Sequence, residues 1–178
     1  MLVGSYWKHR PETPEQAAGR VLAFLERVQH VSPAHRNWFR TGWSRSKALK
    51  NPVSLELQAI GSSFERYFTD VGRRVIPELG FRLDLWNGLN SSFGATIGAY
   101  GERAGNRAVL DVGDEDGSGS DDAQWRALLE AAVAAFEPED GIVVINSTGD
   151  RWPGAKLRDV AWLKYEAGKG ISEFPEFR

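Results

Sequence analysis

The sequence contains no cysteine among its 178 residues, and this absence excludes several kinds of site. Without thiols the chain has no disulfide framework, no zinc site built on thiolates and no catalytic cysteine. Histidine is scarce as well, because only His9, His30 and His35 are present. A Ser-Pro break at residues 32–33 separates His30 from His35, so these two cannot share one helix face as metal-binding histidines do.

Long apolar runs are also lacking. The longest lie around residues 131–136 and 141–145, far short of the ~20 residues that span a membrane. The first twelve residues have no basic start followed by an apolar run, as a signal peptide has. The chain contains no GxSxG, P-loop or HExxH motif. We therefore expect a cytoplasmic binding protein that uses no membrane, metal or cofactor and is not an enzyme.

The net charge is only −2, but the charges are unevenly distributed. Residues 1–80 carry 12 Lys and Arg against 7 Asp and Glu, whereas residues 81–178 carry 10 against 17. The overall value argues against direct nucleic-acid binding, since dedicated nucleic-acid-binding proteins are normally basic. The separation of an excess of basic residues and an excess of acidic residues into the two halves of the chain instead indicates a charged partner.

The first half of the chain is predicted to be mostly helical. Its strongest signal is a capping box from Thr13 to Gln16 with Pro14 at the first helical position, followed by apolar residues at helical spacing. The expected elements are a strand at residues 2–7 and helices at about 14–30, from Ser32-Pro33 through Trp38 and Phe39 to Gly42, and from Ser54 through Phe68.

After residue 80 apolar residues stand at every second position, and this alternation predicts half-buried strands. Short loops join the first three of these strands, as in an antiparallel meander. The expected elements are strands at 81–86, 93–100, 107–112, 141–145 and 160–165, and a helix that begins at Asp121 or Asp122 and reaches Phe136. We therefore expect one α+β domain over residues 1–178, with a mostly antiparallel β-sheet and helices on one face. Its core covers about residues 2–166, followed by a C-terminal tail at 167–178.

Residues 111–122 form an acidic loop with six carboxylates. Placing Gly117 at the sixth position of an EF-hand loop puts Val112 and Ala123 where carboxylates are required, which excludes an EF-hand. Two interpretations stay open: a solvated loop kept polar for solubility, or an acidic surface that docks on a basic partner. The candidates for such contacts are Asp114, Glu115, Asp116, Asp121 and Asp122.

Seven tryptophans are present, and their surroundings differ. Trp125 lies on a helical apolar stripe and Trp162 in a strand, so both are predicted to be buried. Tryptophan is also a common interface anchor, and the sequence leaves burial and an interface role equally open for the four in polar or loop sequence. These four are Trp38, Trp43, Trp86 and Trp152, of which the last three are our interface candidates.

Several short motifs follow one another along the chain from about residue 5 to 166. The motifs are Tyr6-Trp7, Trp38-Phe39, Ala48-Leu49 with Pro52, Leu79-Gly80-Phe81, Leu85-Trp86-Asn87-Gly88, Gly98-Ala99-Tyr100, Asn106, Pro138 through Gly141, and Trp162-Leu163 with Tyr165. In this order they resemble the immunity protein 52 family of bacterial polymorphic toxin systems. The resemblance implies an intracellular α+β protein that neutralises a toxin encoded beside it, with no catalytic residues of its own.

Toxins associated with such proteins are often restriction-endonuclease-like nucleases. A nuclease presents Lys and Arg to phosphates, so an acidic patch on an inhibitor can occupy that surface by imitating the charge of nucleic acid. The expected partner is therefore a cognate toxin, a nuclease, held by stoichiometric binding.

Two other hypotheses compete with this one. The chain could be a small hydrolase that uses Asp or Glu with an unidentified metal, because carboxylate pairs meet only in the fold. It could also be a scaffold or nucleic-acid-linked module that uses residues 36–50, where aromatic and basic residues alternate. The overall acidity counts against the second of these.

Overall fold

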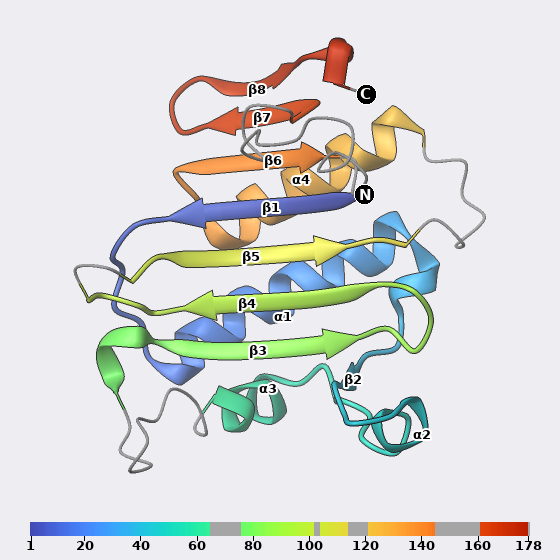
Figure 1. Ribbon diagram of the computed structural model, residues 1–178. Coiled ribbons are helices and arrows are strands. Elements are labelled where there is room, and N and C mark those ends of the chain that lie inside the picture. Colours follow the sequence, from blue (N-terminus) through green and yellow to red (C-terminus); the bar gives the residue numbers. More distant parts are fainter. Residues whose placement is uncertain (65–75, 102–103, 114–120, 145–160, 178) are drawn as a thin grey trace.

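The computed structural model describes residues 1–64, 76–101, 104–113, 121–144 and 161–177. It has one eight-stranded sheet with the order β2-β3-β4-β5-β1-β6-β7-β8, antiparallel at every pair (Figure 1). The strands are β1 (Leu2–Trp7), β2 (Phe39–Arg40), β3 (Phe81–Trp86), β4 (Ser92–Ile97), β5 (Asn106–Asp111), β6 (Asp140–Val144), β7 (Leu163–Glu166) and β8 (Gly170–Glu173). The α-helices are α1 (Pro14–Val31), α2 (Arg45–Ala48), α3 (Leu57–Phe64) and α4 (Asp122–Phe136), with 3-10 turns at Pro33–His35, Pro77–Leu79 and Pro175–Phe177.

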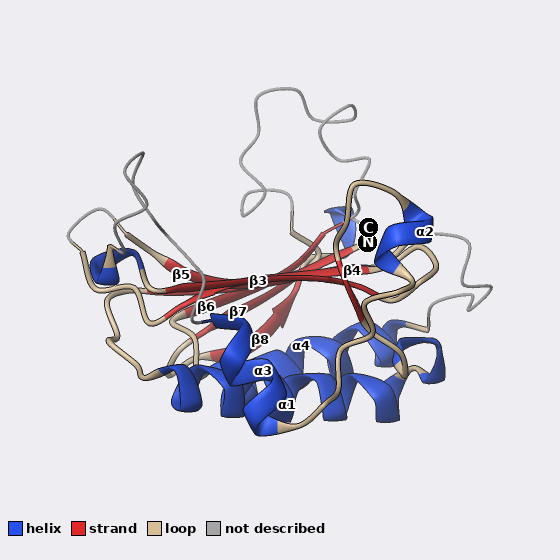
Figure 2. Ribbon diagram, turned by 90° about the horizontal axis from the view of Figure 1, so that it is seen from below, coloured by secondary structure: helices blue, strands red, loops and turns tan. Residues whose placement is uncertain are grey.

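Helices α1, α3 and α4 pack on one face of the sheet, whereas α2 lies on the other side (Figure 2). This arrangement confirms the predicted α+β fold, and β3, β4 and β5 form the expected antiparallel meander. We call the face opposite α1, α3 and α4 the open face. None of the helices in the described parts of the chain is long and apolar enough to cross a membrane.

The start of α1 is determined by local sequence, as predicted. The Thr13 hydroxyl accepts a hydrogen bond from the Gln16 amide at 3.2 Å, and the Gln16 side chain accepts one from the Thr13 amide at 2.8 Å. This reciprocal pair satisfies two amides that the first turn would otherwise leave without partners, and Pro14 needs no donor there. The helix then buries its apolar stripe against the sheet and α4.

Aromatic side chains fill the core between the sheet and the helices. Phe24 of α1 lies 5.2 Å, centroid to centroid, from both Phe93 of β4 and Phe136 of α4, and Trp7 of β1 stacks on Phe136 at 5.5 Å. Such pairs stabilise a core beyond the area they bury. Trp125 and Trp162 are buried as predicted. Among the described residues of the open face, a small apolar cluster is buried beside β6, formed by Ile142, Val144 and Ala161 with the partly buried Leu2 and Tyr6.

The structure corrects two of the helical predictions. Trp38 and Phe39 do not lie on a helix: Phe39 begins the edge strand β2 and pairs with Trp86, while Trp38 is buried in the core. Ser54 does not begin a helix, because the Val53 amide donates to the Trp38 carbonyl and keeps the preceding backbone extended. In both cases pairing with a distant segment outweighs a local helical signal.

The last strand lies inside the segment that we predicted to be a tail. β8 pairs with β7 through a tight turn in which Gly168 and Gly170 have φ values of 81° and 84°. Only glycine adopts this backbone conformation without strain, so these two residues allow the chain to reverse direction.

Candidate interaction surface

Residues 39–52 leave the edge of the sheet and return to it through the short helix α2. The Ser44 hydroxyl caps this helix by accepting a hydrogen bond from the Lys47 amide at 3.3 Å. The Asn51 side chain donates to the Lys47 carbonyl at 2.8 Å, and the Arg40 amide donates to the Asn51 carbonyl at 3.0 Å. These bonds close the loop on itself, so its short helix is held although it packs against little.

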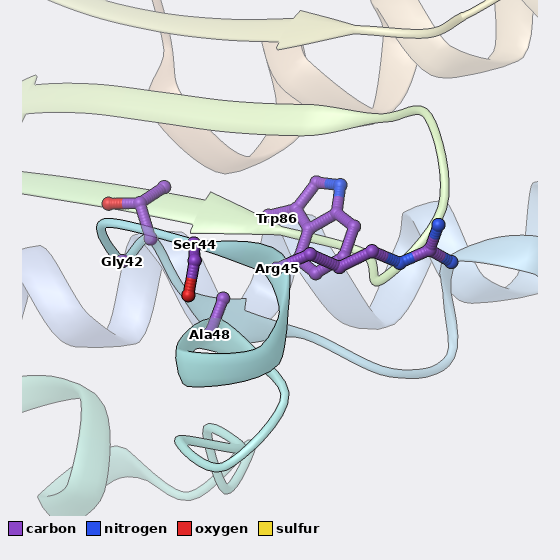
Figure 3. A pocket seen from close by; sticks show the side chains of 6 residues that line it. Gly42, Ser44, Arg45, Ala48 and Trp86 are labelled. Atoms are coloured by element: carbon purple, nitrogen blue, oxygen red, sulfur yellow. The ribbon is translucent and has the colours of Figure 1, made fainter.

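Arg45 connects α2 to the sheet through two contacts. Its guanidinium lies 5.8 Å from the centroid of the Trp86 ring, and Nη2 donates to the Gly88 carbonyl at 3.4 Å. Figure 3 shows Arg45 beside the indole, at the rim of a pocket of about 230 Å³. The pocket is lined by Thr41, Gly42, Ser44, Arg45, Ala48 and Trp86. The cation and the indole of this contact are therefore parts of one pocket wall.

The turn between β3 and β4 positions Trp86. The Asn87 carboxamide oxygen accepts hydrogen bonds from the amides of Leu89 and Ser91, both at 2.9 Å, and Trp86 Nε1 donates to the Leu89 carbonyl at 2.8 Å. Gly88 has a φ of 84°, and a Cβ there would lie 2.9 Å from the Phe39 ring. The Trp-Asn-Gly motif thus forms a turn that only glycine can complete.

Exposed apolar and basic side chains gather around this pocket. Trp43 is 98% exposed, Leu49 is 44% and Leu89 is 53%. Arg45, Lys47 and Lys50 are also exposed. The sequence has no Asp or Glu between Glu26 and Glu56, so no acidic residue of this segment neutralises its cations. We call the set comprising Trp43, Arg45, Lys47, Leu49, Lys50, Trp86 and Leu89 the α2 corner.

Beside the α2 corner, the open face presents polar side chains in rows that run across the strands. Strand register places Arg82, Thr96, Arg107 and Tyr6 next to one another from β3 to β1. The adjacent row is Asp84, Gly94, Val109 and Gly4. Side chains of this protein lie over both glycines of this row: a Cβ at Gly4 would be 2.7 Å from the Tyr6 hydroxyl, and one at Gly94 would be 3.4 Å from the Asp84 carboxylate.

Two shallow hollows occupy this face, with volumes of about 310 and 480 Å³. Arg82 and Asp84 border both, and their side chains form an ion pair at 2.7 Å. Arg107 is exposed, and no acidic side chain in the described parts of the chain forms an ion pair with it. Thr41 lines both the 480 Å³ hollow and the pocket of the α2 corner, so the two surfaces are continuous.

The structure brings only some of the predicted interface residues together. Trp43 and Trp86 both belong to the α2 corner. Asp121 and Asp122 are exposed at the start of α4, on the helical side of the sheet, and the Asp121 carboxylate caps that helix by accepting from the Ala123 amide at 3.2 Å. The remaining candidates lie outside the described residues, and these are Asp114, Glu115, Asp116 and Trp152.

The sequence analysis missed the polar row of the open face. Arg82, Arg107 and Tyr6 each alternate with a buried neighbour in their strand, which already indicated that they point away from the core. The proximity of Tyr6 to Arg107 depends on β1 inserting between β5 and β6, and local patterns do not encode that pairing. The glycine at position 4 was an available signal, because glycine inside a strand marks a close approach, here that of the Tyr6 ring to the backbone.

A charged cluster at the opposite end of β1 has a structural role. Glu12 is 5% exposed at its side chain, and its Oε1 lies 2.9 Å from Arg10 Nε and 2.6 Å from Arg20 Nε. Arg10 and Arg20 also donate to the last carbonyls of α4, those of Phe136 at 2.6 Å and Ala135 at 3.1 Å. Burial lowers the pKa of Arg10, while the neighbouring Glu12 acts in the opposite direction. The cluster therefore caps α4 and ties it to α1.

Within the described residues no three His, Asp or Glu side chains are arranged to hold a metal ion. The geometry on which the hydrolase hypothesis depends is thus missing from that part of the chain. The features that remain are two adjoining surfaces, one aromatic and basic and one polar with shallow hollows. Such surfaces are suited to binding another protein.

Comparison with known proteins agrees with this interpretation. The family model described as Immunity protein 52 matches residues 1–172. A search of curated proteins gave no match. The matched range includes every described helix and most of the last strand, so the resemblance seen in the motifs extends through the fold. The chain belongs to the immunity protein 52 family.

Proposed function

We propose that this protein neutralises a cognate toxin by binding it stoichiometrically, without turnover. The observation that carries the proposal is the family match over residues 1–172. The continuous surface formed by the α2 corner and the open face supports it, since both are held by hydrogen-bonded turns and strands rather than by loose loops. A preorganised surface loses little entropy when a partner binds.

The toxin that we propose is a nuclease, and the support for this class comes from charge. Residues 81–178 carry 17 Asp and Glu against 10 Lys and Arg, and six of those carboxylates fall within residues 111–122. A nuclease gathers Lys and Arg around its phosphate-binding surface. An acidic inhibitor would be drawn to that surface before contact and would then compete with nucleic acid for it.

Co-expression tests the neutralising activity. The gene next to this one is expressed from an inducible promoter in a host that lacks the immunity gene, with and without this chain. We expect the neighbour to stop growth, this chain to restore it, and the purified pair to elute as a 1:1 complex. If the neighbour is toxic and growth is not restored, the proposed function is wrong.

Charge neutralisation tests the nuclease class separately. A variant with Asp114→Asn, Glu115→Gln, Asp116→Asn, Asp121→Asn and Asp122→Asn removes five charges from the acidic segment while keeping the sizes of the side chains. We expect the association rate with the toxin to fall about tenfold at low salt and the difference to shrink at high salt. An unchanged rate and salt dependence would rule out docking through these acids, while the growth test would still report on neutralisation.

A further inference from the structure

We propose that Trp43 is the anchor by which this protein docks on its toxin, and that it enters an apolar recess rimmed by carboxylates on the toxin surface. This inference rests on the proposed function and adds the location and chemistry of one contact. It differs from docking through the acidic segment, because the α2 corner is basic and lies on the opposite side of the sheet from the start of α4 (Figure 2).

The exposure of Trp43 is the first observation. The indole is 98% exposed, whereas Trp7, Trp38, Trp125 and Trp162 are all at least 94% buried. An indole in water forfeits the free energy of burial, about 25 cal/mol for each Å² left exposed. Tryptophan and arginine are also the residues that most often dominate binding energy at protein interfaces. Exposed Leu49 and Leu89 add apolar area in the same corner.

The second observation is that contacts hold the backbone on both sides of Trp43. Ser44, its immediate neighbour, caps α2 through the Lys47 amide, and Arg45 holds the helix against Trp86. Gly42 on the other side lies close to α2, since a Cβ there would be 3.2 Å from the Ala48 amide nitrogen. The backbone on both sides of Trp43 is therefore fixed while its side chain projects into solvent. Binding through such a residue requires little ordering.

Charge identifies the partner surface. Arg45, Lys47 and Lys50 are exposed and follow Trp43 within seven residues, and the nearest acids in sequence are Glu26 and Glu56. Basic side chains around an apolar anchor are complementary to a recess with Asp and Glu at its rim.

A phosphate backbone fits this surface less well than a protein does. The hollow that adjoins the corner at Thr41 is also lined by Asp84 and Asp111. Arg82 lines this hollow too and pairs with Asp84, so the hollow does not continue the basic surface that a phosphate backbone would follow from the corner over the open face. Arg45 is already engaged with Trp86 and the Gly88 carbonyl, which leaves Lys47 and Lys50 as the uncommitted cations of the corner. We therefore favour a protein partner over nucleic acid.

The test is the dissociation constant between the full chain and the purified toxic domain of the neighbouring gene product, with Trp43→Ala as the variant. Tyr100→Ala is the matched control, because Tyr100 is an exposed aromatic residue (43%) at the opposite end of β4. We expect Trp43→Ala to weaken binding at least thirtyfold and Tyr100→Ala less than threefold. Both variants should unfold at the wild-type temperature, since neither side chain is buried.

Lys47→Glu combined with Lys50→Glu tests the charge of the partner. We expect a slower association rate at low salt, by about tenfold, and a smaller effect at high salt. Faster or unchanged association would contradict the proposal that carboxylates line the rim of the recess on the toxin. A labelled 20-base-pair DNA duplex that binds the chain through Trp43 would overturn the preference for a protein partner.

The outcomes separate the two proposals. If the wild-type chain binds the toxin and Trp43→Ala binds as tightly as Tyr100→Ala, only the docking surface is overturned. If the wild-type chain does not bind the toxin at all, the proposed function fails and the docking surface fails with it.

Discussion

The guanidinium of Arg45 lies 5.8 Å from the centre of the Trp86 ring, and this contact joins two segments that are 41 positions apart in sequence. Arg45 is the first residue of α2, and Trp86 is the last residue of β3. The contact therefore determines how the exposed corner sits on the sheet. The contribution of this contact to the free energy of unfolding should be measurable, because the rest of α2 makes few packing contacts.

Replacing Arg45 with Ala should lower the free energy of unfolding by about 1 kcal/mol, since the cation–π contact and the bond to the Gly88 carbonyl are both lost. Urea titration followed by tryptophan fluorescence measures the change. Lys47→Ala is the control, as Lys47 is an exposed cation two residues away and should change stability by less than about 0.5 kcal/mol. Equal stability of the two variants would show that Arg45 does not fasten the corner.

Asn106 should be among the most sensitive polar residues of the protein. Its side chain is buried, accepts from the Ala99 amide at 2.8 Å and donates to the carbonyls of Lys8 at 2.7 Å and Ala99 at 3.1 Å. Asn106→Ala leaves these backbone groups without partners, which should cost about 3 kcal/mol of unfolding free energy. Exposed Asn37→Ala is the control and should cost under about 0.5 kcal/mol. A loss below about 1 kcal/mol at Asn106 would contradict this role.

Glu12 is expected to stabilise the junction between α1 and α4. Glu12→Gln keeps the size of the side chain but removes the buried charge shared by Arg10 and Arg20. The two cations then share only the more exposed carboxylate of Glu137, which lies 3.9 Å from Arg10 and 3.2 Å from Arg20. Both arginine side chains are about a quarter exposed, at 26% and 25%, so we expect a moderate loss. The expected loss is about 2 kcal/mol by chemical denaturation. The exposed residue Glu26 serves as control through Glu26→Gln, and equal losses in the two variants would contradict the assignment.

Asp121 offers a way to separate helix capping from long-range charge. Asp121→Ala removes the acceptor for the Ala123 amide and should cost about 1 kcal/mol of stability, whereas Asp121→Asn keeps a good cap and should cost only a few tenths. Thermal unfolding of the two variants measures the difference. If the Asn variant is as unstable as the Ala variant, the negative charge rather than the cap stabilises α4. The Asn variant is accordingly the one suited to toxin-binding experiments.

Local signals in the sequence predicted much of the secondary structure. The capping box at Thr13 determined where α1 begins, and alternation in residues 81–111 determined three strands and the meander that joins them. These features depend on side chains a few residues apart, so they can be read from a short window. The same reasoning failed at Trp38 and Phe39, where pairing with Trp86 and burial in the core decided the structure.

The sequence by itself determined the fold class, the starts of α1 and α4, the meander, the burial of Trp125 and Trp162 and the family. Only the tertiary structure decided that β1 lies between β5 and β6, which places Tyr6 beside Arg107. It also decided that Trp43 is left in solvent while Trp38, five residues earlier, is buried. The reason is physical: periodicity and capping act within one element, whereas a surface is made by elements whose contacts depend on which faces the whole chain can bury together.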